Sequence, residues 1–122
     1  MRFTQDSISG ISLIRAYGDG TLRINDAVYA GAVIVSPSTV VSEPDIHDLD
    51  ALIAIEKSRI MALDPELVLL GTGRRQVFPG AAFGASFLRV GVGVEVMDTG
   101  AACRTFNVLV AEQRRVVAVL LV

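Results

Sequence analysis

The chain has 122 residues, a formal net charge of −2 at pH 7 and an isoelectric point near 5.3. This length predicts a single domain, residues 1–122, that is large enough to bury a hydrophobic core. The slight acidity argues against a nucleic-acid partner, which would favour clustered lysines and arginines. Apolar residues make up 52% of the sequence, yet the longest purely apolar run covers only residues 116–122. A membrane-spanning helix needs about 20 such residues, so we expect no membrane insertion.

Two features of the sequence predict a cytoplasmic protein. The first segment, MRFTQDSIS, contains no apolar stretch of the kind that a signal peptide requires. Cys103 is the only cysteine, so the chain cannot form an internal disulfide.

The first third of the chain predicts β-structure. Its alternating apolar residues indicate three short strands, at residues 11–17, 21–24 and 28–29. Gly18-Asp19-Gly20 and Asn25-Asp26 provide the turns between them. Residues 32–35 form the first fully apolar strand, and Val40-Val41 would extend it after a kink at Ser36-Pro37.

The middle of the chain predicts two helices on either side of a buried strand. The first helix is capped by Asp48 and runs to about Leu63, with apolar residues at helical spacing. Residues 67–70 are the buried strand, and Gly71-Thr72-Gly73 ends it. The second helix covers residues 79–88 and is weakened by two glycines.

The last third predicts a strand–helix–strand unit. Valines alternate with other residues over 92–97, as is typical of a strand. Asp98 and Thr99 supply N-cap oxygens to a helix over residues 99–111, and the apolar residues 116–122 form a second strand. Such a crossover joins parallel strands, which we therefore expect here.

This order of elements predicts a three-layer α/β domain. From residue 32 onward, strands alternate with helices, and the earlier strands add an N-terminal antiparallel hairpin. The continuous apolar strands are typical of a sheet that is covered on both faces, and helical spacing directs Phe106 into that core. We therefore expect a central mixed, mostly parallel sheet.

The sequence contains no recognisable catalytic set. His47 is the only histidine, and no G-x-S-x-G motif supplies a nucleophile for a triad, so we expect His47 to be exposed near a helix start. Cys103 lies where a helix dipole would favour a thiolate, but we prefer a buried structural thiol. One histidine and one cysteine cannot complete a tetrahedral metal shell without several carboxylates. We predict no catalytic residue, metal or cofactor.

Gly71-Thr72-Gly73 is the most site-like segment. It follows a buried strand, and open α/β sheets bind ligands just beyond the carboxyl ends of their strands. Main-chain N–H groups together with Arg74 and Arg75 would hold an anion there. The segment matches neither the dinucleotide-binding fingerprint nor a P-loop. The alternative is a structural glycine turn by which the chain leaves a crowded sheet.

A second group of polar residues lies in the last strand–helix pair. Glu95 is the single charge in an alternating apolar strand, and Thr99 and Asn107 offer a hydroxyl and an amide nearby in the sequence. If the two strands are neighbours, Glu95 would face a pocket beside the Gly71-Thr72-Gly73 turn. Alternatively, Glu95 faces solvent or pairs with an arginine. The arginines considered are Arg104 and Arg115.

Several segments together resemble a known family. They are Leu69 to Gly73, Val94 to Thr99, Ala102 to Leu109, Glu112 to Ala118 and the Tyr17-Gly18-Asp19-Gly20 turn. The pattern covers nearly the whole chain and resembles a family of small uncharacterised domains that includes mitochondrial complex I assembly factor 3 and a cytosolic adipogenesis-associated protein. Many members are stand-alone bacterial proteins of this size. The resemblance implies a three-layer β+α/β/α fold and, in the eukaryotic branch, binding to other assembly proteins.

Two functions from different classes remain open. The first is a non-enzymatic protein-interaction or assembly-factor-like module, whose partners are other proteins. The second is a small-ligand-binding protein or enzyme with an anion site at Gly71-Thr72-Gly73, Arg74 and Glu95. A cavity on which Thr72, Glu95 and Asn107 converge would favour the ligand. An exposed apolar patch would favour the interaction module.

Overall fold

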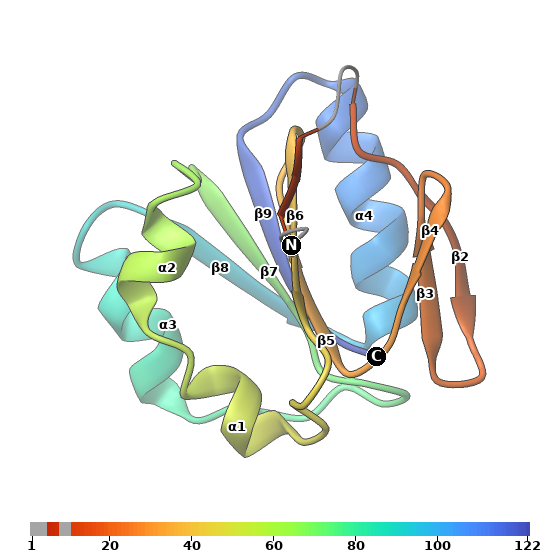
Figure 1. The fold of residues 1–122 in the computed structure, drawn as a ribbon. Coiled ribbons are helices and arrows are strands. Elements are labelled where there is room, and N and C mark those ends of the chain that lie inside the picture. Colours follow the sequence, from red (N-terminus) through yellow and green to blue (C-terminus); the bar gives the residue numbers. More distant parts are fainter. Residues whose placement is uncertain (1–4, 8–10) are drawn as a thin grey trace.

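The computed structural model describes residues 5–7 and 11–122, which form two β-sheets and four α-helices (Figure 1). The strands are β1 (Gln5–Ser7), β2 (Ile14–Gly18), β3 (Thr21–Ile24), β4 (Ala27–Tyr29), β5 (Ala32–Val35), β6 (Thr39–Glu43), β7 (Leu67–Gly71), β8 (Gly93–Met97) and β9 (Val116–Leu121). The helices are α1 (Leu49–Ile53), α2 (Lys57–Met61), α3 (Ala81–Leu88) and α4 (Thr99–Ala111). The segment considered for a signal peptide, residues 1–9, lies largely outside the described residues.

The larger sheet is mixed, as predicted, and has the strand order β1-β6-β5-β9-β7-β8. β8 and β9 are parallel, as expected, but β7 lies between them and pairs with both. β5 pairs antiparallel with β9 and β6, and β6 pairs antiparallel with β1. Two of the five pairings are therefore parallel, so the parallel part is one half of the sheet rather than most of it.

β6 is a separate strand, and the expectation that Val40-Val41 extends residues 32–35 is wrong. The N–H of Ser36 donates a hydrogen bond of 2.8 Å to the oxygen of Thr39, and the chain reverses there. Pro37 favours such a reversal because its φ is fixed and it has no N–H for the ladder. β6 consequently returns antiparallel along β5.

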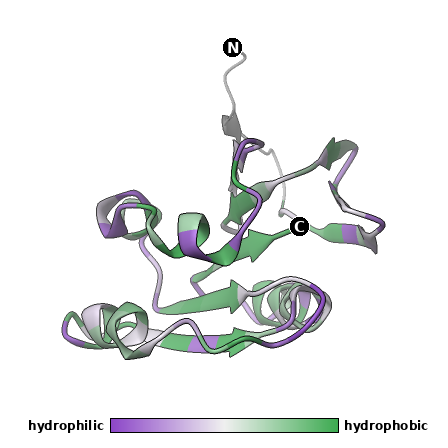
Figure 2. Cartoon of the chain, turned by 90° about the horizontal axis from the view of Figure 1, so that it is seen from below, coloured by the Kyte–Doolittle hydropathy of each residue, from purple (hydrophilic) through white to green (hydrophobic). Residues whose placement is uncertain are grey.

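Each face of the larger sheet carries a layer, which confirms the three-layer β+α/β/α fold. α4 and the small β2-β3-β4 sheet cover one face, and α1, α2 and α3 cover the other (Figure 1). β9 is buried along its whole length and supplies alternate side chains to the two cores. The central strands of the larger sheet, β5, β9 and β7, are almost entirely buried. The interior strands in Figure 2 are correspondingly hydrophobic.

The helix predicted over residues 48–63 is instead two short helices, α1 and α2. Asp48 caps α1 as expected, since its carboxylate accepts a hydrogen bond of 2.8 Å from the first turn. The chain becomes extended at Glu56, where ψ is 129°. Leu52 of α1 and Ile60 of α2 are both fully buried against the sheet.

Candidate functional site

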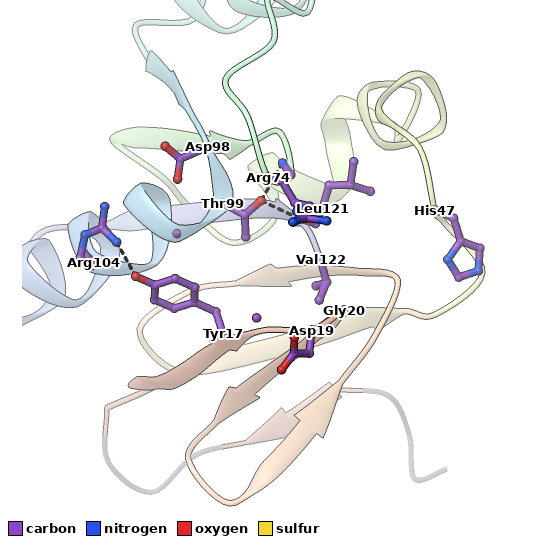
Figure 3. A pocket seen from close by; sticks show the side chains of 13 residues that line it. Tyr17, Asp19, Gly20, His47, Arg74, Asp98, Thr99, Arg104, Leu121 and Val122 are labelled. Atoms are coloured by element: carbon purple, nitrogen blue, oxygen red, sulfur yellow. Dashed lines mark hydrogen bonds between the residues drawn. The ribbon is translucent and has the colours of Figure 1, made fainter.

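A cleft of about 710 Å³ opens at the carboxyl ends of β7 and β9 (Figure 3). It is bordered by the β2–β3 turn, the loop before α1, the loop after β7, the start of α4 and the end of β9. Open α/β sheets bind ligands at this edge, where the strands end. The cleft is therefore the candidate functional site of the domain.

Thr72 shapes the loop that follows β7. Its main-chain N–H donates a hydrogen bond of 2.9 Å to Met97 on β8. Its buried hydroxyl donates to the oxygen of Arg75 at 2.6 Å and accepts from the N–H of Val77 at 3.0 Å. These bonds fold the loop back on itself, so Thr72 lies behind the wall of the cleft and does not line it.

Gly71 allows α4 to begin directly against the end of β7. A Cβ atom at this position would lie 2.8 Å from a methyl carbon of Leu120 and 3.0 Å from the hydroxyl of Thr99. A side chain at this position would require the Leu120 side chain to move and Thr99 to shift by a few tenths of an ångström. Close packing therefore favours glycine at position 71.

Thr99 does not cap α4, although the sequence suggested that it would. Asp98 is the N-cap, and its carboxylate accepts a hydrogen bond of 2.8 Å from the N–H of Ala101. The hydroxyl of Thr99 instead accepts from the N–H of Gly73 at 2.8 Å and donates to the oxygen of Leu121 at 2.6 Å. The predicted N-cap role therefore belongs to Asp98 alone, and Thr99 binds the neighbouring segments together.

Tyr17 forms the rim of the cleft over the first turns of α4. The guanidinium of Arg104 donates a hydrogen bond to the Tyr17 hydroxyl and lies 5.9 Å from the centre of the ring. A Cβ atom on Gly100 would come within 2.7 Å of the same ring. The absence of a side chain at Gly100 therefore lets the tyrosine lie against the helix.

Charged side chains of both signs surround the cleft. The guanidiniums of Arg74 and Arg104 lie on it, as do the carboxylates of Asp19 and Asp98, and the imidazole of His47 also borders it (Figure 3). His47 is exposed, as predicted. The carboxylate of Asp98 accepts a hydrogen bond from the N-terminus of α4 and keeps its charge, so two arginines and two carboxylates face one another around the cleft.

The structure brings together three of the predicted site residues, Gly73, Arg74 and Thr99, on the cleft. Glu95 lies in the middle of β8, opposite Leu69 of β7, and is exposed away from the cleft. It has no ion-pair partner among the described residues, which agrees with the solvent-facing alternative. Thr72, Glu95 and Asn107 therefore do not converge on one cavity.

Asn107 connects two layers of the domain. Its side-chain oxygen accepts a hydrogen bond of 3.0 Å from the N–H of Ile14, and its side-chain nitrogen donates one of 2.9 Å to the oxygen of the same residue. The amide thereby binds β2 to α4 and is not available to the cleft.

Sequence reasoning missed most of the residues that line the cleft, among them Tyr17, Asp19 and Arg104. The Tyr-Gly-Asp-Gly turn was recognised as a hairpin turn and as part of the family resemblance, and Arg104 only as a possible partner of Glu95. The local signal that could have identified this rim is the aromatic Tyr17 directly before a turn that contains two glycines. Nothing local indicates that Arg104 reaches this turn.

Cys103 is buried among the residues of the α4 core, as expected. Burial raises the pKa of its thiol to about 12, and the effect outweighs the nearby Arg104 guanidinium, which lowers the pKa. The thiol is therefore protonated at neutral pH and is a poor nucleophile. Within the described part of the chain, no group of three His, Cys, Asp or Glu side chains is placed to hold a metal ion.

A sequence model described as a protein of unknown function (DUF498/DUF598) matches residues 14–121. The chain belongs to the DUF498/DUF598 family. This finding agrees with the resemblance seen in the motifs. A relative named NADH dehydrogenase [ubiquinone] 1 alpha subcomplex assembly factor 3, from Danio rerio, is 27% identical over 96% of this chain and 68% of its own length.

Other relatives of this DUF498/DUF598 protein are bacterial. The 13 kDa major membrane protein of Francisella tularensis is 29% identical over 99% of both chains. A crystal structure from Bordetella parapertussis is 40% identical, with a TM-score of 0.83 over 93% of this chain and 97% of the other. A Bartonella henselae structure titled an outer membrane protein is 33% identical, with a TM-score of 0.78 over the same shares. None of the helices described for the present chain is long and apolar enough to cross a membrane.

Proposed function

We propose that this domain is a protein-binding module and that it binds its partner through the outer side of α3. The observation that carries the proposal is the apolar character of this helix, whose sequence AAFGASFL contains no charged residue. The outward residues of α3, together with Phe78, which precedes the first residue of the helix by three positions, form a surface that we call the α3 face. The members of the α3 face are Phe78, Ala81, Ala82, Ala85 and Leu88, all of them exposed.

The α3 face differs from an ordinary helix surface. A helix that is apolar on all sides is normally buried, whereas a surface helix carries polar residues on its outer side. Here Phe78 is 78% exposed and Leu88 is 69% exposed. Clustered exposed apolar side chains of this kind mark interaction surfaces.

A small pocket adjoins the α3 face on the side of α1. It has a volume of about 270 Å³ and is lined mainly by apolar side chains, including Ile53, Ile55 and Phe83. A partner's apolar side chain would fit there as an anchor, because anchors at interfaces fill such dry pockets.

The charges around the α3 face favour an acidic partner. Residues 75–94 contain two arginines, Arg75 and Arg89, and no acidic residue. Lys57 adds a third cation, since its ammonium donates a hydrogen bond of 3.1 Å to Ser86 on α3. We infer that the partner is a protein with an apolar contact surface flanked by aspartate and glutamate, which such a rim would orient.

The relatives support a protein partner. The Danio rerio relative is named an assembly factor, and such a factor acts on other proteins. Two bacterial relatives carry membrane-protein names, which raises a lipid surface as the competing occupant. The helix has only eight residues and little difference between its sides, whereas helices that lie on membranes are strongly amphipathic. A protein surface therefore fits the α3 face better.

The test begins with a photo-crosslinking side chain introduced at Ala85 in the full chain, in the native host. We expect one discrete crosslinked protein, which is then purified and its affinity measured. Leu88→Asp should weaken that affinity by about tenfold or more, because it places a charge in the apolar contact. Val28→Asp is the matched control, since Val28 is equally an apolar side chain, 65% exposed, but lies on β4.

Three results would contradict the proposal. The first is that the purified partner binds Leu88→Asp as tightly as it binds the unaltered chain. The second is that the crosslink joins two copies of this chain. The third is that vesicles of phosphatidylglycerol and phosphatidylethanolamine bind the unaltered chain but not Leu88→Asp, which would assign the α3 face to a membrane surface.

A further inference from the structure

We propose that the cleft at the carboxyl ends of β7 and β9 is a separate binding site for a small organic anion, namely a carboxylate or phosphate group attached to an apolar body. This inference does not depend on the α3 face. It rests on the volume of the cleft, on two arginines and on an apolar floor.

The two arginines are the first argument. Arg74 forms no ion pair or hydrogen bond with any of the described residues, and Arg104 bonds only to the Tyr17 hydroxyl. The two guanidiniums on the cleft therefore retain most of their donors for a ligand, and guanidinium matches carboxylate and phosphate oxygens well.

Two carboxylates also lie on the cleft, and neither forms an ion pair with Arg74 or Arg104. Asp98 is held against the start of α4 by its capping hydrogen bond of 2.8 Å, which occupies one of its oxygens. Asp19 is exposed in the β2–β3 turn. In Figure 3, Arg104 and Arg74 lie on two sides of Thr99, Asp98 lies between them, and Asp19 lies beside Gly20. Because its capping bond restrains Asp98, the guanidiniums are the groups of this side of the cleft that have free donors for a ligand.

The apolar floor is the second argument. Leu121 and Val122 line the cleft, and the ring of Tyr17 forms one side of it. An inorganic anion would leave these surfaces wet, whereas a ligand with an aromatic or aliphatic body would cover them. The volume of about 710 Å³ lies within the range of roughly 300–1,000 Å³ that is typical of small-molecule sites.

The site is also preorganised. Thr99 joins the loop after β7 to the end of β9 through its two hydrogen bonds, so the floor is fixed before a ligand arrives. Arg104 is positioned by the tyrosine hydroxyl, which reduces the side-chain freedom that binding would have to remove.

The experiment is a titration of the isotope-labelled full chain followed by amide NMR. The probes are phenyl phosphate and benzoate, which combine a negative charge with an aromatic ring, together with two partial mimics. Inorganic phosphate has the negative charge without the ring, and benzylamine has the ring with a positive charge. We expect saturable shifts at Gly73 and Gly100 with phenyl phosphate or benzoate, weaker shifts with inorganic phosphate, and none with benzylamine.

Arginine variants decide whether the cleft is the site. Arg74→Gln and Arg104→Gln should each weaken binding of the best anionic probe by about tenfold, which is the loss expected for one charge-assisted contact. Arg89→Gln, at the end of α3, is the control and should leave binding unchanged. Leu88→Asp should also leave it unchanged, which separates this inference from the proposed protein interface.

Several outcomes would overturn the inference. No saturable shift with any probe would remove the ligand site, and tighter binding of benzylamine would assign the cleft to cations. Equal affinity of inorganic phosphate and phenyl phosphate would show that the apolar floor plays no part. Unchanged binding in both cleft arginine variants would place the anion elsewhere.

Discussion

The hydroxyl of Thr99 donates a hydrogen bond of 2.6 Å to the main-chain oxygen of Leu121, which joins the start of α4 to the end of β9. The same hydroxyl accepts a hydrogen bond of 2.8 Å from the N–H of Gly73. Because Thr99 is only 7% exposed, water has little access to replace either bond. One side chain therefore fixes three segments that border the cleft.

Replacing the hydroxyl should cost more than the loss of a helix cap. Thr99→Val keeps the shape of the side chain but removes the partner of the part-buried N–H of Gly73 and of the main-chain oxygen of Leu121. We expect a loss of about 2–4 kcal/mol in the free energy of unfolding, against about 1 kcal/mol for a cap. Urea unfolding measures it, and Thr99→Ser, which retains the hydroxyl, is the control. A loss no larger than that of the control would show that the two bonds contribute little.

Phe106 should be the most sensitive core position on α4. It is 0% exposed and packs among residues of the sheet and of β2 and β3. Phe106→Ala should lower the free energy of unfolding by about 3–5 kcal/mol, because it leaves a cavity as well as losing buried apolar surface. Phe106→Leu fills most of that space and should cost clearly less. Equal and small losses in both variants would contradict tight packing at this site.

The burial of Phe106 could be predicted because it depends on local spacing alone. The same is true of the capping residues Asp48 and Asp98, whose oxygens act within one turn of the chain. The predicted pocket residue Glu95 depended on register instead. The structure places it opposite Leu69, in mid-strand, whereas the cleft lies beyond the strand ends.

The rim of the cleft could not be predicted from local pattern for a related reason. Tyr17 and Arg104 are 87 residues apart and meet only because the small sheet packs against α4. Gly100 permits the Tyr17 ring to approach α4 closely, and the sequence analysis did not single out this residue. Such contacts follow from tertiary packing, which a single sequence does not display.

Asn107 should control how firmly the small sheet is attached. Its amide forms both hydrogen bonds to the backbone of Ile14, 93 residues away. Asn107→Leu removes both bonds, and we expect a loss of about 1–3 kcal/mol in the free energy of unfolding. Hydrogen exchange gives a sharper measurement, because the amide of Ile14 should exchange faster while that of Val68, in β7, changes less. Equal acceleration at both amides would indicate a global effect and contradict a local attachment.

The thiol of Cys103 should make stability depend on pH in the alkaline range. Burial raises its pKa from an ordinary value of 9.0 to about 12, so the folded chain keeps a proton that the unfolded chain releases. The unfolded state therefore binds fewer protons above about pH 9, and the free energy of unfolding should fall as the pH rises from there. Urea midpoints at about pH 8 and about pH 10.5 measure the fall, with Cys103→Ala as the control for tyrosine and lysine titration. Between these two pH values, the urea midpoint of the unaltered chain should fall further than that of Cys103→Ala. Equal falls would show that the thiol has the same pKa in the folded and the unfolded chain.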